Sequence, residues 1–404
     1  MDNKPKILLC WGYHRKGWLH AFNALSDDFD FYYLFHLTKP AKEVNHARTD
    51  NILYWTDFHS SQQIISTIKP VKIVFMGIDS PNTIALNTVA KSKNIETLIV
   101  QHGMFHKYSD YLRLAQEEML ERKKRSMFNR SEEHVDRFFL LKFFLRSVVM
   151  IAPLLLFYLA KLKLLKRKHL EIEALKMARS RYRQPDKYIV FTKYNASIYN
   201  ERDGINEDMM IEMGNPELDA YCSHVRKTDD NESYYLLIDQ PWAEVKEYAS
   251  PGYGITQGQT NNFYQKLADF ADKQSAKLKI KLHPYSYNST FLIRHSNIEY
   301  LKDADMVPLI MNSEGVFGFN STLTLPAIYY NRCCLFKIWD ESNYQNEIEK
   351  LKLAQVLDYH SFTEESINFD LIKPNQQAIE QFVKMYFYKV DGKAIVRLRD
   401  ILHS

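Results

Sequence analysis

At residues 278–284 the sequence runs Leu278-Lys279-Ile280-Lys281-Leu282-His283-Pro284. The pattern is typical of a short buried strand that ends at a histidine, with Pro284 stopping the strand. Proline restricts the preceding residue to an extended backbone, so the His283 imidazole is expected to project into the crevice above a sheet. An imidazole held there can donate a hydrogen bond to a phosphate oxygen. A structural or surface histidine is the alternative interpretation.

Similar short apolar runs recur along the chain with helix-length polar segments between them. This alternation is typical of buried parallel strands that are connected by helices, and it predicts an α/β fold. Because several runs end directly in small or polar residues, the sequence predicts ligand contacts at strand ends in both halves. The other candidate strands are residues 6–10, 73–77, 97–101, 188–192, 234–239, 315–319 and 333–336.

The composition fits a folded protein of two domains. The chain has 404 residues, of which 46% are hydrophobic and 25% charged, so a large core can form and long disorder is excluded. We expect an N-terminal Rossmann-like domain at 1–120, a helical insertion at 121–184, a second Rossmann-like domain at 185–375 and a C-terminal helix at 376–404. The four cysteines lack zinc-ligand spacing, which argues against a structural zinc or a disulfide framework. The first residues do not resemble a signal peptide, so a cytoplasmic location is expected.

The predicted insertion combines positive charge with apolar residues. Residues 122–183 hold 17 Lys and Arg against 5 Asp and Glu, and residues 147–160 carry no charge. The apolar run is short for a membrane span and is interrupted by Lys142, Arg146 and Pro153. Cationic flanks around an apolar patch are typical of a segment that lies on an anionic membrane surface. A helical hairpin packed inside the protein and a transmembrane hairpin are the alternatives.

A second polar strand end lies about thirty residues after His283. A buried strand, Gly315-Val316-Phe317-Gly318, leads into Asn320-Ser321-Thr322 and then into an apolar helix. We expect Ser321 and Thr322 to serve as N-cap and first-turn residues, where exposed amides attract anions. An ordinary helix cap is the alternative. Because consecutive βα units place their strand ends side by side, a diphosphate or cytidine monophosphate fits between this turn and His283.

The first half of the chain offers candidate acid–base groups at two strand ends. His102 follows the strand at 97–101 and precedes Gly103, and a histidine is a natural general base for a sugar hydroxyl at neutral pH. A hydrogen-bonded turn residue is the alternative for His102. His106 could orient this histidine, and His14 and Arg15 in the first strand-to-helix turn would suit an anionic donor or acceptor.

Together these segments resemble the GT-B glycosyltransferases that build bacterial capsule and lipopolysaccharide. The resemblance rests on segments in this order: Met213-Gly214-Asn215-Pro216-Glu217-Leu218-Asp219, Leu237-Ile238-Asp239-Gln240-Pro241, Lys281-Leu282-His283-Pro284 and Phe319-Asn320-Ser321-Thr322. It is best over roughly residues 185–400. The nearest types are sialyl-, polysialyl- and Kdo transferases, which use CMP-activated sugars, and CDP-glycerol glycerophosphotransferases of teichoic acid synthesis.

The resemblance implies roles for individual residues. His283 would contact the donor phosphate, and Ser321 with Thr322 would bind it beside Gln240, Pro284, Asn320 and Gly214. His102-Gly103 is similar to the pair that supplies the base in the glycerophosphotransferases, whereas the sialyltransferases carry an acidic residue before that glycine. The 1–120 domain would bind the acceptor, and the 185–375 domain would bind the nucleotide sugar.

The expected function is therefore an inverting glycosyltransferase that needs neither metal nor cofactor. It would move a sugar, with a CMP-activated donor favoured, to a lipid-linked glycan at the inner face of the cell membrane. CDP-glycerol or CDP-ribitol phosphate transfer is an alternative, and UDP-sugar 2-epimerases share the GT-B architecture. A non-enzymatic membrane assembly protein or a nucleic-acid-binding protein is disfavoured, because the aromatic residues of the basic region are not interleaved with cations.

Overall fold

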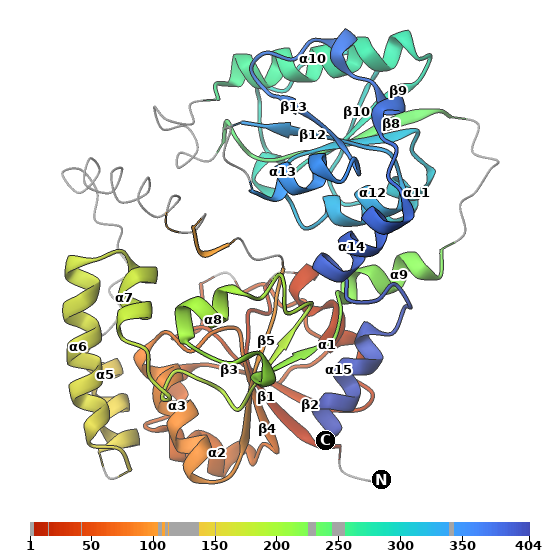
Figure 1. The fold of residues 1–404 in the computed structure, drawn as a ribbon. Helices are drawn as coiled ribbons and strands as arrows, with labels where there is room; N and C mark the ends of the chain where they lie inside the picture. The colour runs from red at the N-terminus through yellow and green to blue at the C-terminus, as the bar shows by residue number, and fades with distance from the viewer. Residues whose placement is uncertain are drawn as a thin grey trace. The chain divides into compact units, whose positions relative to one another are not determined.

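The computed structural model describes residues 4–14, 16–41, 43–103, 107–109, 112, 137–149, 151–224, 232–244, 255–338 and 343–404. The chain forms two compact α/β units, both drawn in Figure 1. Unit 1 comprises residues 1–219 and 385–404, and unit 2 comprises residues 220–384. Each unit is built around one parallel sheet.

Unit 1 contains a seven-stranded sheet in the order β3-β2-β1-β4-β5-β6-β7. All neighbouring strands pair in parallel. The chain moves outward from β1 on one side and from β4 on the other, so the strand order reverses between these two strands. The strands are β1 (Lys6–Cys10), β2 (Asp30–Leu34), β3 (Ile52–Leu53), β4 (Lys72–Phe75), β5 (Glu96–Val100), β6 (Lys187–Val190) and β7 (Met210–Glu212).

Helices cover both faces of the sheet in unit 1 because successive strand residues point to opposite faces. Leu8 and Cys10 of β1 pack in the cluster beneath α2 and α3, and Ile7 and Leu9 pack in the cluster that includes Leu398 of α15. The helices of the main body are α1 (His20–Ala24), α2 (Ser61–Ile68), α3 (Pro81–Ser92), α8 (Ile198–Asp203) and α15 (Ala394–His403), with 3₁₀ helices η1 (Lys16–Leu19), η2 (Trp55–Asp57), η3 (Glu207–Met209) and η4 (Pro216–Leu218).

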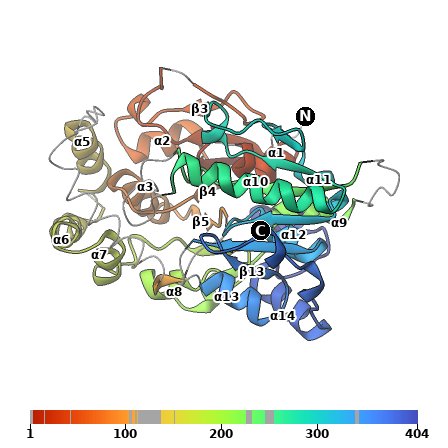
Figure 2. The same ribbon diagram turned by 90° about the horizontal axis from the view of Figure 1, so that it is seen from above.

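Three more helices of unit 1 lie between β5 and β6 in the sequence. They are α5 (Arg137–Val148), α6 (Leu154–Lys168) and α7 (Glu171–Met177). Figure 1 and Figure 2 both show α5 beside α3, outside the sheet. Phe143 and Phe144 of α5 are buried in the core cluster, and Ser147 Oγ accepts a hydrogen bond from the Ser61 N–H at 2.9 Å. One face of α5 is therefore part of the unit 1 core.

Unit 2 contains a six-stranded parallel sheet in the order β10-β9-β8-β11-β12-β13. The strand order reverses between β8 and β11. The strands are β8 (Tyr234–Ile238), β9 (Lys277–Lys281), β10 (Ile298–Leu301), β11 (Gly315–Gly318), β12 (Cys333–Lys337) and β13 (Gln355–Asp358). The remaining elements are α10 (Gln257–Lys273), α11 (Met306–Asn312), α12 (Thr324–Tyr330) and α13 (Asn343–Lys350), with η5 (Pro284–Ser286), η6 (Glu364–Ser366) and η7 (Phe369–Leu371).

The core of unit 2 is unusually aromatic. The α10 side chains Phe263 and Leu267 are buried against Phe317 of β11 and Phe336 of β12. The buried residues of α10 include positions 260, 263, 264, 267, 268 and 271, which is the spacing of one helix face.

Two elements cross the boundary between the units: α9 (Asp219–Cys222) and α14 (Gln376–Tyr386).

The fold confirms the predicted α/β class and corrects the domain boundaries. All eight predicted strands are present within two residues of the predicted limits. The predicted boundary at residue 185 is too early, because β6 and β7 pair with β5 and extend the sheet of unit 1. The helical segment is consequently an insertion within unit 1 rather than a connection between domains. The predicted single helix at 376–404 is two helices, and the second, α15, belongs to unit 1.

Candidate active site

The carboxyl ends of three neighbouring strands in unit 2 bring predicted site residues together. Ile238 of β8 pairs with Lys281 of β9, and Leu237 pairs with Phe317 of β11. Gln240, His283 and Asn320 each lie two residues after the last residue of β8, β9 and β11, at the same edge of the sheet. They lie beside the point where the strand order reverses, which is where open α/β sheets bind ligands.

The conformation of His283 agrees with the effect expected of Pro284. Its backbone is extended, with φ −68° and ψ 148°, and its Nδ1 accepts a hydrogen bond from the Tyr285 N–H at 3.3 Å. In the neutral imidazole the proton then resides on Nε2, which can donate to an anion. The Tyr285 ring stacks on the imidazole with ring centroids 5.3 Å apart.

The turn after β11 differs from the prediction for Ser321 and Thr322. Helix α12 begins at Thr324, and Leu323 occupies the N-cap position. The predicted capping role of Ser321 is therefore wrong. The Ser321 carbonyl accepts hydrogen bonds from the N–H of Thr324 at 3.0 Å and from its hydroxyl at 2.6 Å, so a separate turn precedes the helix. The Ser321 hydroxyl accepts from the Leu323 N–H at 3.3 Å.

Asp239 is a buried acid at the end of β8 that the sequence did not single out as a site residue. It is 4% exposed, and its Oδ2 has no hydrogen-bond partner among the residues that the structure describes. Burial raises the pKa of Asp239 to about 8, although hydrogen bonds from Tyr264 and from the backbone of Gln240 and His283 oppose this rise. At neutral pH the carboxyl group is mostly protonated, so it adds little negative charge to this edge of the sheet.

In unit 1, His102 lies in a rigid turn after β5. The Gln101 side chain donates to the Gly103 carbonyl at 2.8 Å and accepts from the Phe191 N–H at 2.7 Å, which ties the turn to the end of β6. Gly103 has φ +89°, a conformation that favours glycine. The His102 ring contacts Trp11 and Trp18, with ring centroids 5.6 Å away in each case.

Among the other candidates in unit 1, His14 contacts Trp18, and Trp18 also contacts His102. The His14 ring centroid is 5.8 Å from that of Trp18. Gly12 permits this packing, because a Cβ there would lie 2.9 Å from the Trp18 ring. Arg15 and His106 lie outside the described residues, so the structure gives no account of them.

A small cavity opens beside His102. Its volume is about 40 Å³, and its wall includes Trp11, Trp18, His102, Met213 and Glu217. Glu217 was missed as a site residue, although it lies in one of the segments that carry the family resemblance. Burial raises the pKa of its carboxyl group to about 7. A carboxyl and an imidazole therefore face the same space, a pairing suited to binding or deprotonating a hydroxyl group.

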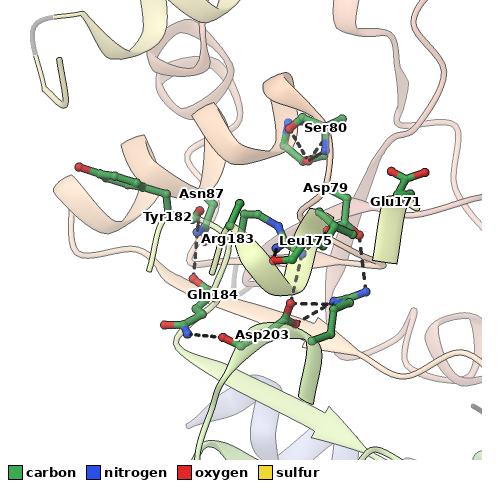
Figure 3. A network of polar contacts seen from close by, with 12 residues as sticks. Asp79, Ser80, Asn87, Glu171, Leu175, Tyr182, Arg183, Gln184 and Asp203 are labelled. Atoms are coloured by element: carbon green, nitrogen blue, oxygen red, sulfur yellow. Dashed lines mark hydrogen bonds and ion pairs between the residues drawn. The ribbon is translucent and has the colours of Figure 1, made fainter. Parts of the chain in front are cut away.

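The end of β4 is occupied by an ion-pair network, shown in Figure 3. Arg183 donates to Asp79 at 2.7 Å and to Asp203 at 3.1 Å, and Arg202 donates to Asp203 at 2.8 Å. Burial opposes ionisation of Asp79, but Arg202 and Arg183 hold its pKa below the usual value. These charges neutralise one another, so Asp79 serves the structure rather than acid–base chemistry.

The predicted donor contact Gly214 and a group of possible metal ligands that was not predicted lie elsewhere. Gly214 belongs to unit 1 and has φ +85°. A Cβ at this position would lie 3.1 Å from the Phe387 carbonyl oxygen, so the backbone conformation and the close packing both require a glycine here. Among the described residues one group of possible metal ligands occurs, Asp269, Asp272 and His295. It lies near the C-terminal end of α10, which leads into the start of β9, and so at the edge of the sheet opposite to His283.

Comparisons with known proteins give matches in structure and none in sequence. No protein-family model matches the chain, and no curated protein matches it. The glycotransferase of kitacinnamycin aligns with a TM-score of 0.52 and 10% identity over 100% of this chain and 99% of that chain. The wall teichoic acid polymerase TagF, soaked with CDPG, aligns with a TM-score of 0.51 and 13% identity over 99% of this chain and 88% of that chain.

A third structure, a UDP-N-acetylglucosamine 2-epimerase, aligns with a TM-score of 0.48 and 10% identity over 100% of this chain and 96% of that chain. The first two likenesses, together with the two parallel sheets, show that this chain has the GT-B fold of two Rossmann-like units.

Proposed function

We propose that this protein is a glycosyltransferase that moves a sugar from a nucleotide donor to an acceptor hydroxyl. The observation that carries the proposal is the set of three side chains at adjacent strand ends in unit 2, Gln240, His283 and Asn320. They are hydrogen-bond donors and acceptors at the position where α/β folds bind ligands. The likeness in fold to the kitacinnamycin glycotransferase supports the same reaction class.

Unit 2 would stabilise the nucleotide phosphate as it departs. The Nε2–H of His283 and the Ser321 hydroxyl can donate hydrogen bonds to phosphate oxygens, and such preoriented donors are worth about 10²–10³ in rate. The protonated state of Asp239 favours this role, because an ionised carboxylate would repel the phosphate. We therefore infer an inverting mechanism in which protein side chains bear the developing charge.

Unit 1 would bind the acceptor, with His102 as the general base. His102 would take the proton from the acceptor hydroxyl group. The hydroxyl oxygen would attack the anomeric carbon of the donor sugar as the bond between that carbon and the donor phosphate oxygen breaks. The hydrogen bonds of Gln101 and the conformation of Gly103 hold His102 in one position, as a base must be held.

Two donor classes are compatible with these groups. A CMP-activated acidic sugar, such as sialic acid or Kdo, is our first candidate, and it would place the protein in capsule or lipopolysaccharide synthesis. The structural likeness to TagF favours a second candidate, CDP-glycerol or CDP-ribitol, from which a polyol phosphate would be transferred. Both donors contain cytidine and phosphate, so the same unit 2 groups would serve either.

We further propose that the helical insertion of unit 1 binds an anionic membrane surface, the inner face of the cell membrane. Exposed apolar side chains gather around the α5–α6 turn and along α6: Val149, Ile151, Leu154, Leu156, Phe157 and Leu164. Phe157 is 75% exposed. Lys161, Lys163, Arg167 and Lys168 are exposed on the second half of α6. Apolar side chains beside cations are suited to contact with the headgroup region. No described helix is long and apolar enough to cross a membrane.

A panel of activated donors tests the proposed reaction. The purified protein would be incubated with CMP-N-acetylneuraminic acid, CMP-Kdo, CDP-glycerol, CDP-ribitol and UDP-N-acetylglucosamine, and nucleotide release and thermal protection would be measured. We expect a cytidine donor to be protective and to be cleaved, with His283→Ala reducing cleavage about 10²-fold. His360→Ala, an exposed histidine of unit 2, is the control. Failure of every donor to protect or to be cleaved would contradict the proposal.

A further inference from the structure

The cavity beside His102 contains a carboxyl group whose role the proposed reaction leaves open. Glu217 is carried into the cavity by 3₁₀ helix η4, directly after β7. The residues that precede it fix its position. The Asn215 side chain accepts a hydrogen bond from the Glu217 N–H at 3.0 Å, and the Met213 carbonyl accepts one from Arg397 Nε at 2.6 Å.

No described basic side chain forms an ion pair with Glu217, in contrast to Asp79 and Asp203 nearby in the same unit. The carboxyl group instead faces space that is also lined by Trp18 and His102. Glu217 is half-buried, so its carboxyl oxygens can accept hydrogen bonds from a molecule in this space. The position of Glu217 is therefore suited to accepting a hydrogen bond from a bound molecule.

The size and lining of the cavity restrict what can bind. A water-sized group needs about 10–15 Å³, so about 40 Å³ holds roughly three hydroxyl or water oxygens. That is enough for the hydroxyl-bearing edge of a sugar. A carboxyl group repels phosphate and other anions, whereas tryptophan rings such as Trp11 and Trp18 pack well against the C–H groups of a sugar.

We propose that Glu217 binds a hydroxyl group of a neutral acceptor sugar in this cavity, beside His102. The inference rests on the proposed function, because it presumes a sugar acceptor in unit 1. Glu217 thereby fixes which hydroxyl reaches His102, so it is a specificity-determining residue of the acceptor site. The segment Met213-Gly214-Asn215-Pro216-Glu217 then has a function of its own, separate from donor binding.

Fluorine NMR of the full chain labelled with 5-fluorotryptophan provides the test. The Trp18 resonance is assigned with Trp18→Phe, and Trp55, which packs against Phe143 in the core, is the internal reference. The probes are the methyl glycosides of galactose, glucose and N-acetylglucosamine, with that of N-acetylneuraminic acid as the anionic comparison. We expect at least one neutral glycoside to shift Trp18 but not Trp55, and the anionic glycoside to bind more weakly.

At pH 8, above the pKa of about 7 that burial gives Glu217, Glu217→Gln should weaken the binding of that neutral glycoside about ten-fold or more, because hydrogen bonds to charged groups are strong. The control Glu207→Gln removes an exposed carboxylate of unit 1 and should leave the affinity unchanged. Absence of any Trp18 shift, or equal affinities in the two variants, would overturn the inference. CMP and CDP are tested on the same samples by thermal shift: if nucleotide protects while no glycoside binds, the inference fails alone, and if neither binds, the proposed function fails as well.

Discussion

The carboxyl edges of the two sheets share a topology but differ in charge. In unit 1 the edge holds Glu217 and His102, which line one cavity. In unit 2 the corresponding edge holds the neutral or hydrogen-bonding side chains Gln240, His283 and Asn320. An edge with acids is suited to hydroxyl groups and proton transfer, and an edge without ionised acids is suited to an anion. The difference supports an acceptor role for unit 1 and a donor role for unit 2.

Two aspartates show how partners and burial set the charge of an acid at a strand end. Asp79 stays ionised because Arg183 and Arg202 lower its pKa, whereas Asp239 has no arginine beside it and burial raises its pKa to about 8. Two aspartates that each follow a central strand thus reach opposite charge states. Fold alone does not assign function to such sites, but the charge state of their side chains restricts it.

The strongest test of the comparison separates chemistry from nucleotide binding. His102→Ala should reduce transfer by about 10²–10⁴-fold, because the acceptor hydroxyl loses its base, while the Kd for nucleotide stays unchanged. His283→Ala should weaken nucleotide binding as well as transfer. Transfer rates and nucleotide affinity by calorimetry would be measured for both variants.

The contrast between the two histidines fails if His102→Ala loses nucleotide affinity, since His102 would then be a donor ligand. It also fails if both variants transfer sugar at near-normal rates. His59→Ala removes an exposed histidine of unit 1 that does not line the cavity beside His102, so it controls for the loss of an imidazole.

The next largest effect concerns the stability of unit 1. Arg183→Met should destabilise the protein by about 2–3 kcal/mol, because the buried Asp203 loses one of its two arginine partners and keeps Arg202. Arg181→Met removes an exposed arginine two residues away and should cost less than about 0.5 kcal/mol. Thermal unfolding of both variants checks this. Equal unfolding temperatures would mean that the network in Figure 3 contributes little to the fold.

The inner strands were predictable because strands buried on both faces are continuous apolar runs, as in Tyr234–Ile238. The strands that sequence reasoning missed include all four sheet edges: β3, β7, β10 and β13. These are short or polar, as Ile298-Glu299-Tyr300-Leu301 illustrates. Strand β2 was also missed although it is internal. The predicted domain boundary is too early for the same reason, because the pairing of β7 with β6 is a long-range contact that no local pattern reveals.

The candidate site was predictable where a polar residue directly follows an apolar strand. His283, Gln240 and Asn320 meet this condition, and the parallel pairing of their strands brings them to the same edge of the sheet. Glu217 does not, because it follows a three-residue strand and a turn. Its position beside His102 depends on β5, β6 and β7 being neighbours. The capping role of Ser321 was predicted wrongly because a turn in front of α12 cannot be distinguished from the helix by composition alone.

A smaller effect tests the charge state of Asp239. Burial in the folded protein raises the pKa of the Asp239 carboxyl group to about 8. Protonation of this group therefore favours the folded state at low pH, and this contribution to stability is lost as the pH increases from about 4 to about 8. Asp239→Asn cannot ionise, so the variant should gain about 2 kcal/mol relative to wild type between pH 6 and pH 9. Urea unfolding across this range measures the difference, with the exposed Asp370→Asn as the control. A constant difference would mean that Asp239 is ionised throughout, and unit 2 would lose its contrast with unit 1.

The smallest effect tests whether membrane contact belongs to unit 1. Each cation near an anionic surface contributes about 1 kcal/mol, so Lys163→Gln should weaken binding to vesicles containing phosphatidylglycerol about five-fold. Lys350→Gln removes an equally exposed charge from α13 of unit 2 and should change nothing. Binding is measured by co-sedimentation at low and high salt, since screening should release part of the bound protein. Donor cleavage without a lipid acceptor should be the same in both variants, because neither lysine lies at a proposed site. If both substitutions weaken binding equally, the attraction to the vesicles reflects the overall charge of the protein. If the wild type does not bind these vesicles at all, the apolar residues around Phe157 do not bind a membrane.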